Sequence, residues 1–182
     1  MSGSSTDRIT GFENAAGGAA GDRLHGTAGA NLIEGNGGTD MLFGYGGDDT
    51  LSGGASFDAL VGGAGRDLLT GGAEADSFVF AARADSGATS ATRDLITDFE
   101  DVRDVIDLAL IDANTTTAAN DAFRFIGSHA AFTAHAGELR AVYSATGEVV
   151  EADTNGDGVA DLSIALRDTA HSIVLTEVDF LL

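Results

Sequence analysis

Residues 17–79 read GGAAGDRLH-GTAGANLIE-GNGGTDMLF-GYGGDDTLS-GGASFDALV-GGAGRDLLT-GGAEADSFV, which is one nine-residue unit written seven times. Position one is always Gly, position six is Asp or Asn, and position eight is aliphatic or aromatic. An unbroken period of nine indicates a repeat architecture, because a flexible glycine-rich linker has no reason to keep an apolar residue in register. The position-eight residues are Leu24, Ile33, Leu42, Leu51, Leu60, Leu69 and Phe78.

Each unit combines a turn with a short strand. The first six residues predict a tight turn, because glycine adopts backbone conformations that other residues avoid. The last three predict a strand of about three residues with position eight pointing into a core. Two units, or 18 residues, then form one turn of a parallel β-roll, so residues 18 apart stack. Position six makes a first edge of Asp22, Asp40, Asp58 and Asp76, and a second edge of Asn31, Asp49 and Asp67.

Stacked carboxylates about 5 Å apart repel one another, and a divalent cation between them removes the repulsion. Calcium suits such a place because it takes roughly six to eight oxygen ligands, including backbone carbonyls. Three gaps on the first edge and two on the second predict about five calcium ions. The gap between Asn31 and Asp49 lacks one carboxylate and is expected to be the weakest. Ser56 and Glu74 replace Gly at position four, and Phe57 is a bulky residue at position five.

Composition supports a folded, cation-binding protein. The 182 residues are 43% hydrophobic and include 26 Gly but no Pro, Cys or Trp. The formal net charge of −20, from 29 acidic and 9 basic residues, argues against nucleic acid and anionic membranes as partners. The N-terminus lacks the apolar stretch of a signal peptide, and no run is long enough to insert in a membrane. Without cysteines, metal is the expected substitute for disulfides in an extracellular protein.

The second half is poorer in glycine and richer in strand-like runs. Ala145–Gly147 predicts a hairpin turn, and residues 112–121 and 128–137 predict polar or alanine-rich connections. The predicted strands are 94–99, 104–111, 122–127, 138–143, 148–152, 161–166 and 172–182.

A second acidic loop lies between two of these strands. Asp153, Asn155, Asp157 and Asp161 place side-chain oxygens at alternate positions around glycines, like the start of an EF-hand loop. Its twelfth position is Ile164 instead of the bidentate Glu, so it is no true EF-hand. A calcium site and a plain hairpin turn both fit this pattern.

The repeats, followed by DLITDFEDVRDVIDLALIDA, FRFIGSHAAF, AGELR, ADTNGDGVADLSIAL and a terminal VDFLL, resemble the C-terminal RTX domain of serralysin-type (peptidase M10) metalloproteases. Mannuronan C5-epimerases and other type I-secreted proteins contain similar modules. The resemblance covers about residues 9–182. It implies an all-β fold, in which a parallel β-roll is followed by an antiparallel, sandwich-like C-terminal half.

The resemblance also implies that carbonyls at positions one, two and four and the position-six side chain bind calcium. The ligand set expected from the repeats is Gly17, Gly18, Ala20, Asp22, Gly26, Thr27, Gly29, Asn31, Gly35, Asn36, Gly38, Asp40, Gly44, Tyr45, Gly47, Asp49, Gly53, Gly54, Ser56, Asp58, Gly62, Gly63, Gly65, Asp67 and Asp76.

By the same resemblance, the terminal residues 179–182 are similar to an uncleaved secretion signal, although they also fit a last β-strand. Neither HExxH nor GxSxG occurs, so no catalytic site is expected.

The leading hypothesis is a secreted, non-catalytic calcium-binding module for calcium-triggered folding and type I secretion. Its expected partners are the type I secretion apparatus and an N-terminal catalytic domain. The alternative is a polysaccharide-binding accessory module. The expected parts are a lead-in strand (1–16), the roll (17–80) and the C-terminal half (81–182).

The repeats also predict an unequal exposure of the two faces of the roll. Odd-numbered units direct apolar residues such as Met41 and Phe43 outward, whereas even-numbered units direct mostly polar ones such as Glu34 and Thr50. An exposed apolar stripe favours aggregation. We therefore expect the C-terminal half or a partner subunit to cover the face that contains Met41 and Phe43.

Overall fold

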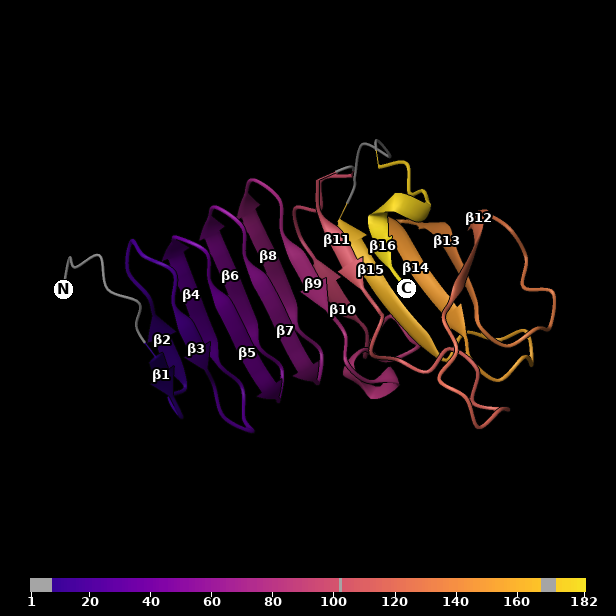
Figure 1. Cartoon of the computed structure of the whole chain (residues 1–182), viewed down its shortest axis with the longest axis horizontal. Coiled ribbons are helices and arrows are strands. Elements are labelled where there is room, and N and C mark those ends of the chain that lie inside the picture. The colour runs from indigo at the N-terminus through magenta and orange to yellow at the C-terminus, as the bar shows by residue number, and fades with distance from the viewer. Residues whose placement is uncertain (1–7, 102, 168–172) are drawn as a thin grey trace.

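The structure is a computed structural model that describes residues 8–101, 103–167 and 173–182. Two β-sheets are stacked face to face and extend along the long axis of the molecule (Figure 1). In the described residues one sheet has the order β1-β3-β5-β7-β9-β11-β16, and the other has the order β12-β13-β14-β15-β10-β8-β6-β4-β2. No helix within these ranges is long and apolar enough to cross a membrane. The predicted all-β parallel roll is confirmed.

The elements are short, and their bounds follow the nine-residue period through the repeats. The strands are β1 (Arg8–Thr10), β2 (Asn14–Ala16), β3 (Arg23–His25), β4 (Leu32–Gly37), β5 (Met41–Gly46), β6 (Thr50–Ala55), β7 (Ala59–Ala64), β8 (Leu68–Ala73), β9 (Ser77–Val79), β10 (Asp94–Ile96), β11 (Val105–Asp107), β12 (Arg124–Ser128), β13 (Glu138–Ser144), β14 (Gly147–Asp153), β15 (Leu162–Arg167) and β16 (Phe180–Leu181). Among the residues that the structure describes, two 3₁₀ helices, η1 (Arg83–Asp85) and η2 (Glu177–Asp179), connect strands.

The strands of the roll pair in parallel with an offset of 18 residues, as the repeat predicts. Leu32 pairs with Thr50 in one sheet, and Met41 pairs with Ala59 in the other. The strands β4 to β8 are six residues long, and not three, because pairing continues into the next turn. Asn36, at position two of its unit, still pairs with Gly54.

Position eight forms the core between the sheets. All seven position-eight side chains are fully buried and stack in two rows. Burying one Leu or Ile in this way contributes roughly 1.5–3 kcal/mol. Beyond the repeats, Ile96 of β10 and Ile106 of β11 continue the rows with no exposed surface.

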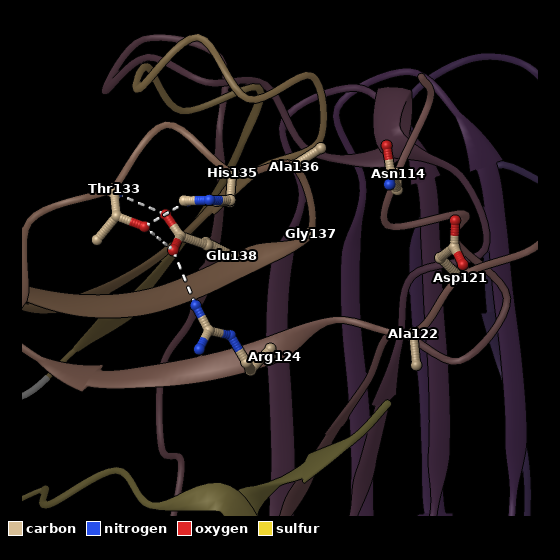
Figure 2. A pocket seen from close by; sticks show the side chains of 9 residues that line it. All are labelled: Asn114, Asp121, Ala122, Arg124, Thr133, His135, Ala136, Gly137 and Glu138. Atoms are coloured by element: carbon tan, nitrogen blue, oxygen red, sulfur yellow. Dashed lines mark hydrogen bonds and ion pairs between the residues drawn. The ribbon is translucent and has the colours of Figure 1, made fainter. Parts of the chain in front are cut away.

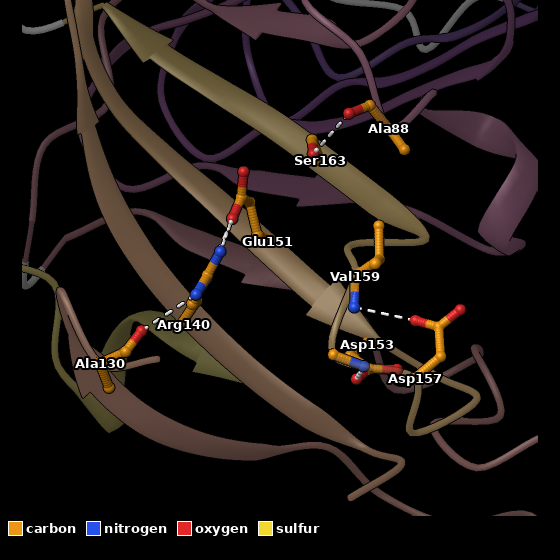
Figure 3. Close-up of polar contacts among 9 residues, drawn as sticks. Ala88, Ala130, Arg140, Glu151, Asp153, Asp157, Val159 and Ser163 are labelled. Atoms are coloured by element: carbon orange, nitrogen blue, oxygen red, sulfur yellow. Dashed lines mark hydrogen bonds and ion pairs between the residues drawn. The ribbon is translucent and has the colours of Figure 1, made fainter. Parts of the chain in front are cut away.

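The C-terminal half is built onto the same two sheets. β10 pairs with both β8 and β15, and β11 pairs with both β9 and β16, so the sheets run across residue 80 without interruption. β13, β14 and β15 are antiparallel, and the predicted hairpin turn joins Ser144 to its partner Gly147. Arg140 and Glu151 are register partners in this hairpin, and their side chains form an ion pair of 2.7 Å (Figure 3).

Three predicted strands are no more than half as long as expected, and one of them, 94–99, forms strand only at Asp94–Ile96. The run 104–111 forms strand only at Val105–Asp107. The run 172–182 begins outside the described residues, and from 173 onward it contains η2 and the two-residue β16.

The C-terminal half does not cover Met41 on the apolar face of the roll, so this half of the expectation was wrong, and cover by a partner subunit stays a prediction. Met41 is 41% exposed, because the later strands extend the sheets at their far end instead of folding back over β5 (Figure 1). Phe43 is half-buried by its own neighbours: the ring of His25 stacks on it at 4.7 Å, and the Arg23 guanidinium lies 4.5 Å from its centroid.

Candidate functional site

The first edge is a chain of hydrogen bonds between stacked turns. The backbone N–H of Asp22 donates to Asp40 Oδ1 (2.6 Å), that of Asp40 to Asp58 Oδ1 (2.8 Å), and that of Asp58 to Asp76 Oδ1 (2.9 Å). Each step joins residues 18 apart, as predicted. One oxygen of each carboxylate therefore holds the preceding turn in place.

The second edge has the same construction, and both edges continue past the repeats. Asn31 N–H donates to Asp49 Oδ1, and Asp49 N–H donates to Asp67 Oδ1. Beyond them, Asp67 N–H donates to Asp94 Oδ1 (2.8 Å), while Asp76 N–H on the first edge donates to Asp104 Oδ1 (3.0 Å).

Asp94 and Asp104 were absent from the predicted site. Both precede an apolar residue by two positions, as the repeats do, since Ile96 and Ile106 occupy the core. Asp94 also follows Asp67 by 27 residues, which is three repeat lengths. That spacing is the signal that could have found it.

In six carboxylates along these edges, the second oxygen, Oδ2, accepts no hydrogen bond. The side chains are buried, and loss of water without a replacement partner is costly for a carboxylate. Buried Oδ2 atoms without a partner occur in Asp40, Asp49, Asp58, Asp67, Asp76 and Asp94. The first edge differs at its two ends, because Asp22 Oδ2 accepts the Gly18 N–H and Asp104 Oδ2 accepts the Glu100 N–H.

Burial shifts the ionisation of these carboxyl groups strongly. It raises the pKa of Asp49 and Asp58 to about 6, of Asp67 and Asp76 to about 7 and of Asp94 to about 9. The hydrogen bond from the preceding turn opposes this rise in pKa, and neighbouring carboxylates add to it. The pKa values of Asp40 and Asp104 are raised for the same first cause, burial. The edges therefore disfavour negative charge unless a cation compensates it.

The position-one glycines leave open the space that these oxygens face. A Cβ built on Gly35 would lie less than 3.0 Å from both Asp40 Oδ2 and the carbonyl oxygen of Gly53. A Cβ on Gly44 would meet Asp49 Oδ2 and the Gly62 carbonyl in the same way. A carboxylate oxygen and a carbonyl oxygen of the next turn thus face one small space. Oxygen donors of this kind fit a hard divalent cation such as Ca²⁺.

Positions two and four supply the backbone bend of the turns. In units three to seven these residues have a positive φ: Asn36, Gly38, Tyr45, Gly47, Gly54, Ser56, Gly63, Gly65, Gly72 and Glu74. The corresponding residues of the first two units, Gly18, Ala20, Thr27 and Gly29, have no positive φ. The first two turns thus have a different backbone conformation from the other five.

In the part of the chain that the structure describes, side chains alone do not form a metal cage. Within the described ranges, no group of three or more His, Cys, Asp or Glu side chains converges on one point. Each turn instead offers one carboxylate together with backbone oxygens, so an ion here would depend on the carbonyls.

The predicted loop at 153–161 is closed by its own hydrogen bonds. Asp153 accepts from the N–H groups of Gly156 (2.7 Å) and Gly158 (2.8 Å), and Asp161 accepts from Thr154 N–H (2.9 Å). Asp157 Oδ1 accepts the Val159 N–H, as Figure 3 shows. The acidic side chains therefore order the turn without a metal, and Asp157 lies on its outer side.

A separate polar cavity of about 550 Å³ lies in the C-terminal half (Figure 2). Its buried carboxylate, Glu138, accepts hydrogen bonds from Arg124 and from the backbone and side chain of Thr133. Burial raises the pKa of Glu138, but these hydrogen bonds and the Arg124 charge outweigh it, so the pKa is lowered. Glu138 therefore remains ionised and anchors the loop before β13.

One family model matches nearly the whole chain. The family described as Peptidase M10 serralysin C terminal matches residues 4–181. No curated protein matches the chain. Two solution structures of subunits of mannuronan C5-epimerase from Azotobacter vinelandii are similar to it. AlgE6R3 is 31% identical with a TM-score of 0.41, and covers 90% of this chain and 78% of its own. AlgE6R2 is 27% identical with a TM-score of 0.49, and covers 97% of this chain and 91% of its own.

Proposed function

The chain belongs to the peptidase M10 serralysin C-terminal family, and from this premise we propose that it is a non-catalytic module whose folding is triggered by calcium outside the cell. The observation that carries the proposal is the set of six buried carboxylate oxygens without a donor along the two edges. A protein that folded without cations would have to bury these oxygens unpaired or protonated.

The residues that would hold calcium are the position-six carboxylates and the backbone carbonyls of the turns. Bound Ca²⁺ would supply positive charge and coordination positions for oxygen ligands. The carboxylates use Oδ1 to hold the preceding turn and leave Oδ2 for the cation. About five ions at the five predicted gaps would offset half of the formal charge of −20. Asp94 and Asp104 belong to this proposal as the residues that continue the edges.

We include the loop at 153–161 as one further calcium site. Its side-chain oxygens stand at alternate positions, and the hydrogen bonds within the loop order it before any ion binds. Asp157 lies at the outside of the turn, where a cation could reach it.

Metal-binding energy becomes folding energy when the unfolded chain has no site. Extracellular modules often bind calcium at roughly 10⁻⁴–10⁻³ M, which suits the outside of a cell and not the cytosol. We propose that the unfolded acidic chain passes through a type I secretion apparatus and that folding outside opposes its return. The terminal residues 179–182 would serve as the secretion signal, and a linked N-terminal catalytic domain would be the cargo.

The division into a lead-in (1–16), a roll (17–80) and a C-terminal half (81–182) is also part of the proposal. Because both sheets run across residue 80, we expect the roll and the C-terminal half to fold in one transition. The lead-in starts outside the described residues and continues with β1 and β2.

A calcium titration followed by circular dichroism tests the proposal. In chelator the chain should lack most of its β-signal, and calcium should restore it cooperatively. Asp58→Ala should raise the midpoint calcium concentration by about tenfold, equivalent to about 1.4 kcal/mol. Glu34→Ala removes the same charge from an exposed strand position and should leave the midpoint near that of the wild type. Full β-structure and unchanged thermal stability in chelator would contradict the mechanism.

A further inference from the structure

Two of the six asparagines of the chain are followed directly by glycine. Asn36 precedes Gly37 in the third repeat, and Asn155 precedes Gly156 in the second acidic loop. Asparagine in this context can modify itself, because glycine has no Cβ to hinder its backbone nitrogen. That nitrogen can attack the side-chain amide of the asparagine and close a cyclic imide. The reaction requires a glycine N–H that is free to lose its proton and an amide that can turn toward it.

The folded roll holds both reacting groups of the third repeat in hydrogen bonds to the preceding turn. The backbone N–H of Gly37 donates to the carbonyl oxygen of Gly18 (3.1 Å), and Asn36 Nδ2 donates to that of Gly17 (3.1 Å). Asn36 is exposed, so these bonds and not burial restrain its side chain. Both bonds cross from one turn of the roll to the next, and they therefore exist only while the turns are stacked.

The second acidic loop restrains its asparagine with local partners. The backbone N–H of Gly156 donates to Asp153 Oδ1 (2.7 Å). The side-chain amide of Asn155 is held at both ends, because Nδ2 donates to Asp161 Oδ1 (3.1 Å) and Oδ1 accepts the Asp157 N–H (2.8 Å). A carboxylate acceptor also makes the Gly156 N–H harder to deprotonate. The folded loop thus opposes the reaction at the attacking nitrogen and at the amide.

We propose that these two asparagines are self-modification sites that folding switches off, and that Asn36 limits how long an unfolded chain can still fold. In the unfolded chain, the glycine nitrogen forms a bond to the asparagine Cγ, and the Cγ–Nδ2 bond breaks. The amide nitrogen leaves as ammonia, with the proton that the glycine nitrogen gives up. Water then opens the cyclic imide at either carbonyl, which gives aspartate or isoaspartate. The reaction consumes only water.

The product at residue 36 damages the turn that contains it. Asn36 has a φ of 74° and pairs with Gly54 in the register between β4 and β6. Isoaspartate adds a carbon atom to the main chain at this point, so the turn no longer matches the turn that stacks on it. The carbonyl at position two is also a proposed calcium ligand, and this part of the inference rests on the proposed function. At residue 155 the new carboxylate faces Asp161 and repels it.

Peptide mapping by mass spectrometry, on the whole chain aged at mildly alkaline pH, tests the chemistry. In the unfolded chain, residues 36 and 155 should gain the mass of deamidation. In the folded chain they should do so at least about tenfold more slowly. Asn120 is exposed but precedes Asp121, so it should change slowly in both states. Equal rates in the folded and unfolded chain, or no conversion in the unfolded chain, would overturn the proposal.

Circular dichroism of the fresh samples separates this result from the calcium proposal. If calcium triggers folding, chelator provides the unfolded chain and saturating calcium provides the folded one. A chain that is already folded in chelator contradicts calcium-triggered folding. The unfolded state is then prepared in urea, and the rates of conversion should still follow the folded fraction.

Matched variants test the consequence for folding. After ageing in the unfolded state, the modified wild type should need about tenfold more calcium to regain its β-signal. Asn36→Gly removes the site, and glycine has a positive φ at the same position of later units in Gly54, Gly63 and Gly72. This variant should fold and keep its calcium midpoint after ageing. Asn120→Gly makes the same change at an exposed residue outside the repeats and should age as the wild type does. If aged Asn36→Gly loses its calcium response as far as the wild type, Asn36 does not limit folding.

Discussion

The backbone N–H of Asp67 donates to Asp94 Oδ1 over 2.8 Å, although 27 residues separate the two. The bond repeats the step that joins position-six residues 18 apart inside the roll. This step is longer by one repeat length of nine residues, which lies in the connection between β9 and β10, and the second edge resumes at Asp94. Because β10 also pairs with β15, this step links the repeats to the C-terminal half.

Asp94→Asn should have opposite effects with and without calcium. Asn keeps the acceptor for Asp67 N–H but carries no charge, whereas burial raises the pKa of the Asp94 carboxyl to about 9. In metal-free buffer at pH 8 the variant should be more stable by roughly 1 kcal/mol or more. In calcium it should need more of the ion to fold. Urea unfolding under both conditions measures the two effects.

Asp104→Asn is the matched comparison, because Asp104 is also buried at the end of an edge but both its oxygens accept N–H groups. Its carboxylate is already partnered, so the change should destabilise the protein in both buffers. If Asp94→Asn also lowers the stability of the protein in metal-free buffer, Asp94 acts only as a hydrogen-bond acceptor.

The sequence predicted the roll because its period fixes three things at once: the turn, the buried residue and the stacking of position six. The 18-residue register and the burial of residues such as Leu42 and Leu60 follow directly. The hairpin around Thr146 was also predictable, because a short glycine-containing turn separates two apolar runs.

The other features of the fold and of the site depend on contacts between segments that the nine-residue period does not encode. In the described residues 173–182, only Phe180–Leu181 finds a pairing partner, the edge of β11, and nothing in the sequence of this run reveals it. The rings of His25 and Tyr45, which belong to the same sheet as Phe43, cover its side chain. The sequence pattern alone predicted a cover by the C-terminal half or a partner subunit. Asp94 and Asp104 lie in segments without the glycine turn, so the motif did not mark them.

Ser56→Gly should stabilise the roll. Ser56 has a φ of 83° at position four, where most other late units have Gly, and a non-glycine residue in this region costs roughly 1 kcal/mol. Thermal unfolding in calcium should show a higher Tm. The reciprocal change, Gly47→Ala, should lower the Tm, because Gly47 has a φ of 95° and its new Cβ would approach Ala30 N within 3.0 Å. If Ser56→Gly leaves the Tm unchanged, an unseen contact of the hydroxyl compensates the strain.

Asp157→Ala should remove one bound calcium ion and leave the ions of the roll in place. The residue lies at the outside of the 153–161 loop, and its side chain accepts one hydrogen bond, from Val159 N–H, so loss of the side chain should not unfold the hairpin. Native mass spectrometry counts the ions directly. An unchanged count would identify the loop as a plain turn, which Asp153 and Asp161 can close by themselves.

Acid should replace calcium as the trigger of folding. The pKa values of the folded protein, about 6 for Asp49 and Asp58, about 7 for Asp67 and Asp76 and about 9 for Asp94, exceed the value of about 3.9 for an unfolded Asp. Between these limits the folded state binds more protons than the unfolded state, so its stability falls as pH rises. The stabilisation is fully present below about pH 4 and is lost as pH rises through about 6 to 9.

In buffer freed of calcium on a chelating resin, β-structure should therefore increase when the pH is lowered from 9 to 5. In saturating calcium the order reverses, because protons compete with the cation for the carboxylates. Circular dichroism across pH in both buffers measures the two slopes. Parallel slopes would mean that the buried carboxylates of the edges do not control folding.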